Sequence, residues 1–286
     1  MDVGIGLPNT VPWADGRGLI EWARRADARG FSSLATIGRV AYPGHDELVA
    51  LAAAAGATER IGLMTDILLV PTRNPVLLAK QAASVDLLSG GRLTLGVAVG
   101  GRPDDYEATG ATWSDRGRRL DGAVETMRRI WAGEPVGGAD RPLVARMLRD
   151  DGIPLLFGGT NDRTIDRVIG WGVGWTAGGG GPDATAAFAA RVREAWSSAD
   201  RPGAPRIVSL AYAALGDGVD VGRAYLRDYY AFAPPYAERV AASMLPSPEA
   251  VAEALDRYRS ADVDELILMG TVADPEQVDL LADAAL

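Results

Sequence analysis

Eight apolar runs of strand length, spread along the whole 286-residue chain, restrict most strongly the folds that are open to it. Segments with the 3.6-residue periodicity of amphipathic helices separate consecutive runs. Strands that are apolar on both faces and alternate with helices are typical of a parallel sheet covered by helices. The predicted strands span residues 3–7, 33–36, 61–69, 93–99, 154–157, 174–177, 207–214 and 265–269.

This pattern predicts an α/β fold in which eight parallel strands close into a (β/α)8 TIM barrel, with residues 1–286 forming a single domain. Two long connections are expected to be insertions: residues 133–152 after the fourth helix, and 216–263 between the seventh and eighth strands. The alternative is a doubly wound open sheet, which normally carries G-x-G-x-x-G after its first strand. The stretch GIGLPN does not complete that motif, because Asn9 stands at the third glycine position.

The charge balance and the residue counts exclude several classes of function. A formal net charge of −9 repels phosphate backbones and anionic lipid heads, so we expect no nucleic-acid partner and no membrane binding. The chain has no cysteine and a single histidine, His45, which excludes thiolate chemistry and two-histidine metal sites, and we expect no metal. No uncharged apolar run reaches the length of about 18 residues that a membrane span needs, and no basic leader precedes one, which predicts a soluble, cytoplasmic protein.

In such a barrel the chemistry lies at the carboxyl ends of the strands, so the residues that follow each predicted strand are the ones to inspect. Glycines follow the fourth, fifth and sixth strands, where they let a ligand approach the backbone closely. The stretch FGGTND is the best anion site, because its glycines precede a helix whose N-terminus offers free N–H groups. The alternative for this stretch is an ordinary helix cap. The residues concerned are Gly158, Gly159, Thr160 and Asn161.

Acid–base candidates are few. Asp66 interrupts the apolar third strand, where a carboxylate is costly unless it is partnered at a site, and we predict a catalytic role for it. Arg39, after the second strand, is predicted to bind an anionic group of a substrate or cofactor. Asp104, Asp105 and Glu107 follow the fourth strand, where acidic loops are common. A site with so few acids, bases and metal ligands indicates that a cofactor supplies the chemistry.

Aromatic side chains near the strand ends are candidates for the substrate site, namely Tyr42, Tyr106, Trp175 and Tyr229. The insertion at residues 216–263 carries further tyrosines, Tyr230 among them. This insertion is either a lid over the barrel mouth or a set of helices that pack their own aromatic side chains.

Three stretches resemble the bacterial-luciferase-like family of flavin- or deazaflavin-dependent oxidoreductases. The first is ATERIGLMTDILLVPTRNPVLLAKQAASVDLLSGGRLTLGVAVGGRPDDYEATG, and RGRRLDGAVETMRRIWAGEP follows it. The third is PLLFGGTNDRTIDRVIGWGVGWTAGGG. The similarity covers nearly the whole chain and is densest over residues 1–180.

The resemblance implies a barrel that binds FMN or the deazaflavin coenzyme F420 at the face where the strands end. In that family a bulge in the third strand, often with a non-proline cis peptide, backs the flavin ring, and the matching pair here is Asp66 and Ile67. The loop that matches residues 158–161 holds the cofactor's phosphate. The residues that match Gly100, Gly101, Ala177 and Gly178 line its tail.

One departure from the family pattern bears on the chemistry. Many members carry an Asp-His pair after the second strand, and the matching positions here are Gly38 and Arg39. The histidine is an acid–base or ring-contacting group in several of them. We expect Arg39 instead to stabilise negative charge that develops on the reduced ring or on a peroxide.

The resemblance therefore implies a flavin-dependent oxidoreductase of monooxygenase type that acts on a small organic substrate. One alternative is an F420-dependent dehydrogenase or reductase that transfers a hydride, and another is a catalytically degenerate flavin-binding paralogue. A third is a lyase or isomerase barrel that holds a phosphorylated substrate, although the strand ends carry no lysine. Expected partners are a flavin reductase that supplies reduced cofactor and a second copy of the chain in a homodimer.

Overall fold

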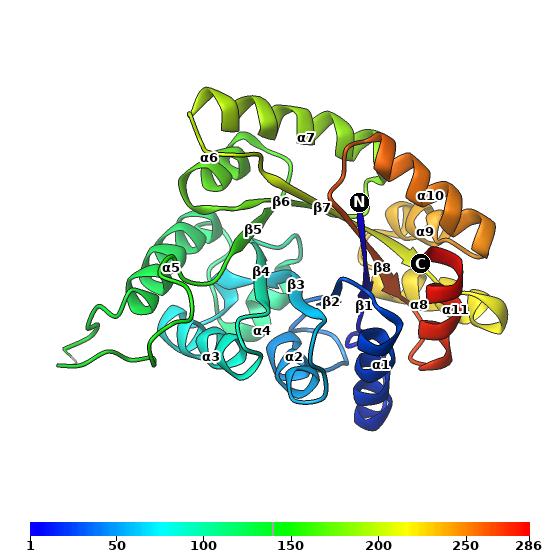
Figure 1. The fold of residues 1–286 in the computed structure, drawn as a ribbon, viewed down its shortest axis with the longest axis horizontal. Coiled ribbons are helices and arrows are strands. Elements are labelled where there is room, and N and C mark those ends of the chain that lie inside the picture. Colours follow the sequence, from blue (N-terminus) through cyan, green and yellow to red (C-terminus); the bar gives the residue numbers. More distant parts are fainter. Residues whose placement is uncertain (139) are drawn as a thin grey trace.

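The computed structural model describes residues 1–138 and 140–286. Within these residues, eight parallel strands close into a barrel in which each strand pairs with the next along the chain and the last pairs with the first. The helices lie outside the ring of strands (Figure 1). The predicted (β/α)8 barrel is thus confirmed, and the doubly wound alternative is wrong.

The observed strands match the predicted ones within one residue at each end, because the apolar runs stop where turn residues begin. They are β1 (Asp2–Gly6), β2 (Ser33–Thr36), β3 (Gly62–Leu69), β4 (Leu93–Ala98), β5 (Leu155–Gly158), β6 (Gly174–Ala177), β7 (Arg206–Ala213) and β8 (Glu265–Gly270).

The helices follow the strands in alternation, with additional helices after β4 and after β7. They are α1 (Gly16–Arg29), α2 (Glu47–Ala55), α3 (Pro75–Leu88), α4 (Pro103–Thr109), α5 (Arg116–Trp131), α6 (Asp162–Trp171), α7 (Gly181–Ser198), α8 (Val219–Tyr229), α9 (Pro234–Ser243), α10 (Pro248–Ser260) and α11 (Glu276–Ala285). The segment from 132 to 154, between α5 and β5, has neither helix nor strand in its described residues and extends away from the barrel (Figure 1).

The inside of the barrel is filled by pairing small residues of one strand with large residues of its neighbour. Side chains alternate between the barrel interior and the layer under the helices along each strand. A Cβ on Gly4 would lie 2.5 Å from Ile267 Cδ1, and a Cβ on Gly6 would lie 2.1 Å from Met269 Sδ. The β8 side chains therefore occupy space that a larger residue on β1 would need.

A polar cluster lies at the amino-end of the strands. The buried carboxylate of Glu265, at the start of β8, accepts hydrogen bonds from the hydroxyls of Ser32 at 2.5 Å and Ser33 at 2.6 Å. Arg206 forms an ion pair with the same carboxylate. In (β/α)8 barrels the active site lies at the carboxyl ends of the strands, so this cluster at the amino-end is a stabilising feature.

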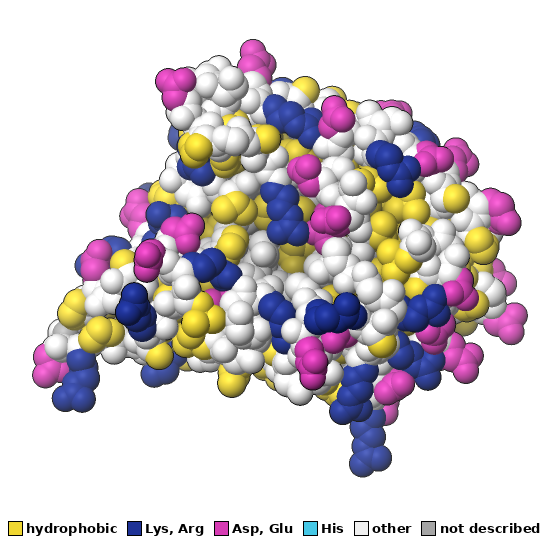
Figure 2. Space-filling model, in the orientation of Figure 1, with side chains coloured by type: hydrophobic (Ala, Val, Ile, Leu, Met, Phe, Trp, Pro, Cys, Tyr) yellow, Lys and Arg dark blue, Asp and Glu magenta, His cyan; other side chains and the backbone are white. Residues whose placement is uncertain are grey.

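The surface shows charges of both signs close together. On the face drawn in Figure 2, basic and acidic side chains are interspersed rather than gathered by sign. Among the described residues, no helix combines the length and the apolar character needed to cross a membrane.

We predict that Gly6→Ala destabilises the barrel by about 1–3 kcal/mol, because the new methyl group would overlap Met269 in a filled interior. Urea denaturation would measure the loss. The matched control is Gly122→Ala on α5, where a Cβ meets no atom within 4 Å and alanine favours the helix, so its stability is unchanged or higher. Equal stability of Gly6→Ala and the wild type would contradict the packing argument.

Candidate active site

The glycine loops that follow β4, β5 and β6 lie side by side, because these strands are neighbours in the barrel. Gly101 and Gly178 are exposed, and a Cβ on either would meet no atom within 4 Å. Gly100 has a φ of +76°, a left-handed conformation that favours glycine. Ala177 is buried in the core beneath the helices, so its side chain is not available to a ligand. Three of the four residues predicted to line a cofactor tail therefore share one open side of the mouth.

The loop between β5 and α6 contains the helix cap that we weighed against an anion site. The Asn161 side-chain oxygen accepts a hydrogen bond from the Thr164 N–H at 3.1 Å. Gly159 has a φ of +113°, and its carbonyl accepts a hydrogen bond from the Trp175 indole at 2.7 Å. The cap occupies one side-chain oxygen and leaves Thr160 exposed, so it is compatible with a bound anion.

Strand β3 is irregular at the pair that the resemblance singles out. Its register against β4 shifts between Thr65 and Leu68, and the peptide bond between Asp66 and Ile67 is cis. The predicted bulge and non-proline cis peptide are both confirmed. Ile67 is partly exposed, and its side chain lies 3.3 Å from where a Cβ on Gly158 would be. It thus forms an apolar surface next to the glycine loops.

Asp66 is directed into the barrel. Its Oδ1 accepts a hydrogen bond from the Thr176 hydroxyl at 2.7 Å. Because β3 and β6 are not neighbours in the barrel, this bond crosses its interior. Within the described residues, the other oxygen, Oδ2, is buried without a hydrogen-bond partner.

Burial raises the pKa of Asp66 to about 7, although the Thr176 hydrogen bond lowers it and the charge of Glu265 raises it further. A carboxyl group with this pKa holds a proton in part of the molecules at neutral pH. It is therefore suited to exchange a proton with a ligand in the mouth.

Glu47 is a second buried carboxyl group that the sequence analysis missed. It is the first residue of α2, and its carboxylate accepts a hydrogen bond from Arg73 at 2.8 Å. Burial raises its pKa to about 7, while Arg73 lowers it. In the sequence it follows Asp46, the helix cap, and an acid there is typical of an ordinary first turn. Only the packing of α2 against the barrel shows that it is buried.

Arg39 is held by two carboxylates from α4. Its guanidinium contacts Asp104 at 2.9 Å and Asp105 at 3.1 Å, and its side chain is 4% exposed. Asp105 also accepts the N–H groups of Val40 and Ala41, at 2.8 Å each. These contacts fix the loop after β2 and neutralise the charge that we expected Arg39 to offer a ligand. Its Nη1, for which the described residues provide no hydrogen-bond partner, is the part of the side chain that still fits the predicted role.

Helix α8 lies across the carboxyl ends of the strands. Thr10, after β1, forms a hydrogen bond to the Tyr225 hydroxyl at 2.7 Å. Tyr42, after β2, donates to Asp228 at 2.5 Å. Arg102, after β4, donates to the carbonyl of Tyr229 at 2.7 Å. Three loops around the mouth therefore hold one helix.

Two of the aromatic residues predicted for the substrate site, Tyr42 and Tyr229 of α8, contact each other. The rings of Tyr42 and Tyr229 pack edge to face with their centroids 5.1 Å apart, and Arg39 lies within 5.7 Å of both centroids. Tyr230 packs on Tyr229 at 4.9 Å. The insertion thus both covers the mouth and packs its own aromatics, so the two readings of it are compatible. Whether it opens stays a prediction.

The other two aromatic residues do not fit the substrate site, and this part of the prediction is wrong. Trp175 is 1% exposed and packs on Phe188 of α7, because Thr176, its neighbour on β6, is the residue that faces the interior. Tyr106 is also 1% exposed, with its hydroxyl bonded to the carbonyl of Val99. Both side chains are already enclosed by the fold.

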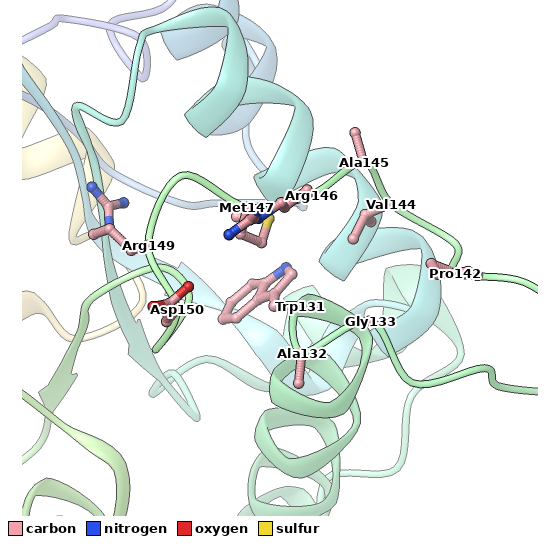
Figure 3. A pocket seen from close by; sticks show the side chains of 10 residues that line it. All are labelled: Trp131, Ala132, Gly133, Pro142, Val144, Ala145, Arg146, Met147, Arg149 and Asp150. Atoms are coloured by element: carbon pink, nitrogen blue, oxygen red, sulfur yellow. The ribbon is translucent and has the colours of Figure 1, made fainter.

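A cavity of about 280 Å³ lies apart from this site, between the end of α5 and the segment from 132 to 154 (Figure 3). Arg149, which lines it, is bonded to the carbonyls of Gly91 and Leu93, at the amino-end of β4. The cavity therefore lies away from the barrel mouth. In the part of the chain that the structure describes, no group of three or more His, Cys, Asp or Glu side chains is placed to hold a metal ion.

We predict that Asp66→Asn changes how stability depends on pH. Folding raises the pKa of Asp66 from 3.8 to about 7, so the stabilisation from its proton is complete below about pH 4 and is lost as pH rises to 7. The wild type should lose up to about 1.4 kcal/mol per pH unit from this group in that window, and Asp66→Asn should not.

Urea denaturation between pH 5.5 and about 8 measures this slope. The control is Asp151→Asn, which removes an exposed carboxylate. Parallel curves for the wild type and Asp66→Asn would show that Asp66 has an ordinary proton affinity.

Comparison with known proteins places the chain in a family. The model of the luciferase-like monooxygenases matches residues 1–283. An uncharacterized Mycobacterium tuberculosis protein is 32% identical over 201 residues, which cover 61% of this chain and 69% of that protein.

Two solved structures share the fold. The monooxygenase RslO1 from Streptomyces bottropensis superposes with a TM-score of 0.79 at 24% identity, covering 99% of this chain and 98% of its own. An F420-dependent secondary alcohol dehydrogenase, solved with an F420-acetone adduct, superposes with a TM-score of 0.78 at 18% identity. The match covers 99% of this chain and 98% of the dehydrogenase chain. At these identities both matches speak for the fold alone. With the family match over almost its full length, the chain belongs to the luciferase-like monooxygenases.

Proposed function

We propose that the chain is an oxidoreductase of monooxygenase type that binds FMN or coenzyme F420 in the barrel mouth and acts on a small organic substrate. One observation carries the proposal: the β3 bulge presents Asp66 and Ile67 beside the open glycine loops after β4, β5 and β6. An apolar surface next to exposed backbone suits a flat ring with an anionic tail.

The residues of the mouth fit such a cofactor. A Cβ on Gly158 would fall 3.3–3.4 Å from Ile67 and Ala98, so the glycine is what lets the Ile67 side chain lie against the β5 backbone. Gly158, Thr160 and the α6 N-terminus are proposed to hold the phosphate, and Gly100, Gly101 and Gly178 the tail. When bound, FMN or F420 supplies the redox chemistry.

The protein's own contribution is positioning, proton transfer and exclusion of water. Ile67 would support the cofactor ring, and Asp66 would hold a proton at Oδ2, which has no hydrogen-bond partner among the described residues. Helix α8 covers the site and keeps water out. Tyr42 and Tyr229 are proposed to contact the substrate, and Tyr229, which is buried, would have to move to do so.

Hydride transfer to or from F420 is the alternative activity, and the fold shared with the F420-dependent secondary alcohol dehydrogenase supports it as a candidate. The degenerate flavin-binding paralogue also stays a candidate, since Arg39, at the position of the family's histidine, has its charge neutralised by Asp104 and Asp105. A monooxygenase of this type is proposed to receive reduced FMN from a separate flavin reductase.

We predict that the protein binds FMN or F420 and that Gly158→Val weakens binding at least about tenfold, because its methyl groups would displace Ile67, which is proposed to support the ring. Fluorescence titration of the purified protein with each cofactor measures this. Gly122→Ala, remote from the mouth, is the matched control. Dioxygen uptake with reduced FMN, or hydride transfer with F420, then separates the two activities.

Binding of neither cofactor would overturn the proposed function and leave the phosphorylated-substrate barrel. Tight binding without consumption of any acceptor would favour the degenerate paralogue.

The proposed homodimer has a candidate interface on α2 and α3, which pack side by side (Figure 1). Val49 on α2 and Leu77 and Leu88 on α3 are 65%, 56% and 73% exposed. The exposed positions of these two helices include a single charged residue, Lys80. An apolar outer face of this kind is typical of a surface covered by a second subunit.

We predict a dimer in solution that the double variant Val49→Glu and Leu77→Glu converts to monomer, because four charges would be buried in the interface. Light scattering after size-exclusion chromatography measures the mass. Val221→Glu, at an equally exposed apolar position on α8, should leave the mass unchanged. A monomeric wild type would rule this interface out.

A further inference from the structure

Glu47 lies beside the bulge of β3, near the end of β2. A Cβ on Gly38, just past the end of β2, would lie 2.9 Å from Glu47 Oε1 and 2.7 Å from the Ile67 carbonyl oxygen. The carboxyl group of Glu47 thus occupies the place where a side chain on residue 38 would begin. A residue from α2 thereby brings an acid to the end of β2, next to the residues proposed to support the cofactor ring.

The charges around Glu47 do not balance. The Nη2 of Arg73 contacts both Asp46, at 2.9 Å, and Glu47, at 2.8 Å, so two carboxyl groups share one guanidinium. The Asp46 side chain is 38% exposed and the Glu47 side chain is 2% exposed. Water solvates the charge of Asp46, whereas Glu47 depends on Arg73 alone, so the proton of the pair resides on Glu47.

Tyr229 of α8 is influenced by the acids around it, Glu47 among them. Burial raises the pKa of Tyr229, and the negative charges of Asp105, Glu47 and Asp104 add to that rise. Arg39 lowers this pKa, and it is the geometry at Gly38 and Ile67 that brings Glu47 next to the mouth. The charged and titratable groups that face Glu47 are Arg73, Asp46 and Tyr229, with Asp66 on the adjoining bulge.

We propose that Glu47 is a second proton-exchanging carboxyl group of the active site, which gives a proton to, or takes one from, a hydroxyl or carbonyl oxygen of the ligand in the mouth. The inference rests on the proposed function, because it assigns a residue to the same site. Only a proton moves: the carboxyl group that gives it becomes a carboxylate, which stays hydrogen-bonded to Arg73. The substrate class is accordingly a compound with an oxygen that gains or loses a proton as it reacts.

The test is the number of protons exchanged when FMN or F420 binds, measured between pH 6 and 8 by calorimetry in buffers of different ionisation heat. FMN and F420 are anionic, so either cofactor bound in the mouth adds negative charge near Glu47 and raises its proton affinity, and the wild type should take up part of a proton near neutral pH. Because Asp66 titrates in the same range, the comparison is made in the Asp66→Asn background, where adding Glu47→Gln should abolish the remaining uptake.

Asp46→Asn provides a signature that a purely structural role would not produce. Asparagine keeps the helix cap but removes the negative charge of Asp46. Arg73 then pairs with Glu47 alone and lowers its pKa, so the pH of maximal proton uptake should decrease. Uptake that is unchanged by Glu47→Gln, with cofactor binding intact, would overturn the inference and leave the proposed function standing.

If the wild type binds neither cofactor, the proposed function fails. The side-chain carboxyl resonance of Glu47, assigned by Glu47→Gln and followed by NMR in protein labelled with carbon-13 glutamate, then decides the inference separately. A titration midpoint near neutral pH that moves down in Asp46→Asn supports a proton-holding Glu47. A midpoint near the ordinary glutamate value of about 4.3 overturns it.

Discussion

The hydrogen bond between Thr176 and Asp66 is the interaction on which the site depends most, because it joins strands that are not neighbours across the inside of a closed barrel. The bulge in β3 is what directs Asp66 inward while Ile67 stays against the glycine loops. The bulge thus supplies both a titratable group and an apolar surface. The rest of the barrel is regular and provides the frame that holds these two residues in place.

Near the mouth, two arginines are each shared between two acidic side chains. Arg39 is shared between two carboxylates of α4, and Arg73 between two carboxyl groups at the start of α2. In each pair one acid is more exposed than the other. At the start of α2, water solvates the charge of the exposed Asp46, so burial acts on the proton affinity of Glu47. This difference separates Glu47 from Asp46, although the two are adjacent in sequence.

Much of the fold follows from the sequence, because a parallel barrel needs apolar strands and amphipathic helices in strict alternation, and these patterns are local. The bulge at Asp66 also followed, through family resemblance. The errors arose where orientation matters. Strands that are apolar on both faces do not reveal which residues face inward, so Trp175 was assigned to the mouth when its neighbour Thr176 faces the interior. Glu47 was missed because its burial comes from tertiary packing.

The three N–H groups that converge on Asp105, from the Arg39 side chain and from the backbone of Val40 and Ala41, make the loop after β2 and the helix after β4 a single unit. Residues 39–41 and 104–105, which make these contacts, consequently form one structural unit. Chimaeras that exchange one segment between relatives without the other would leave a buried acid facing an unmatched loop. Changes to this rim of the mouth would therefore have to be made in both stretches of the chain together.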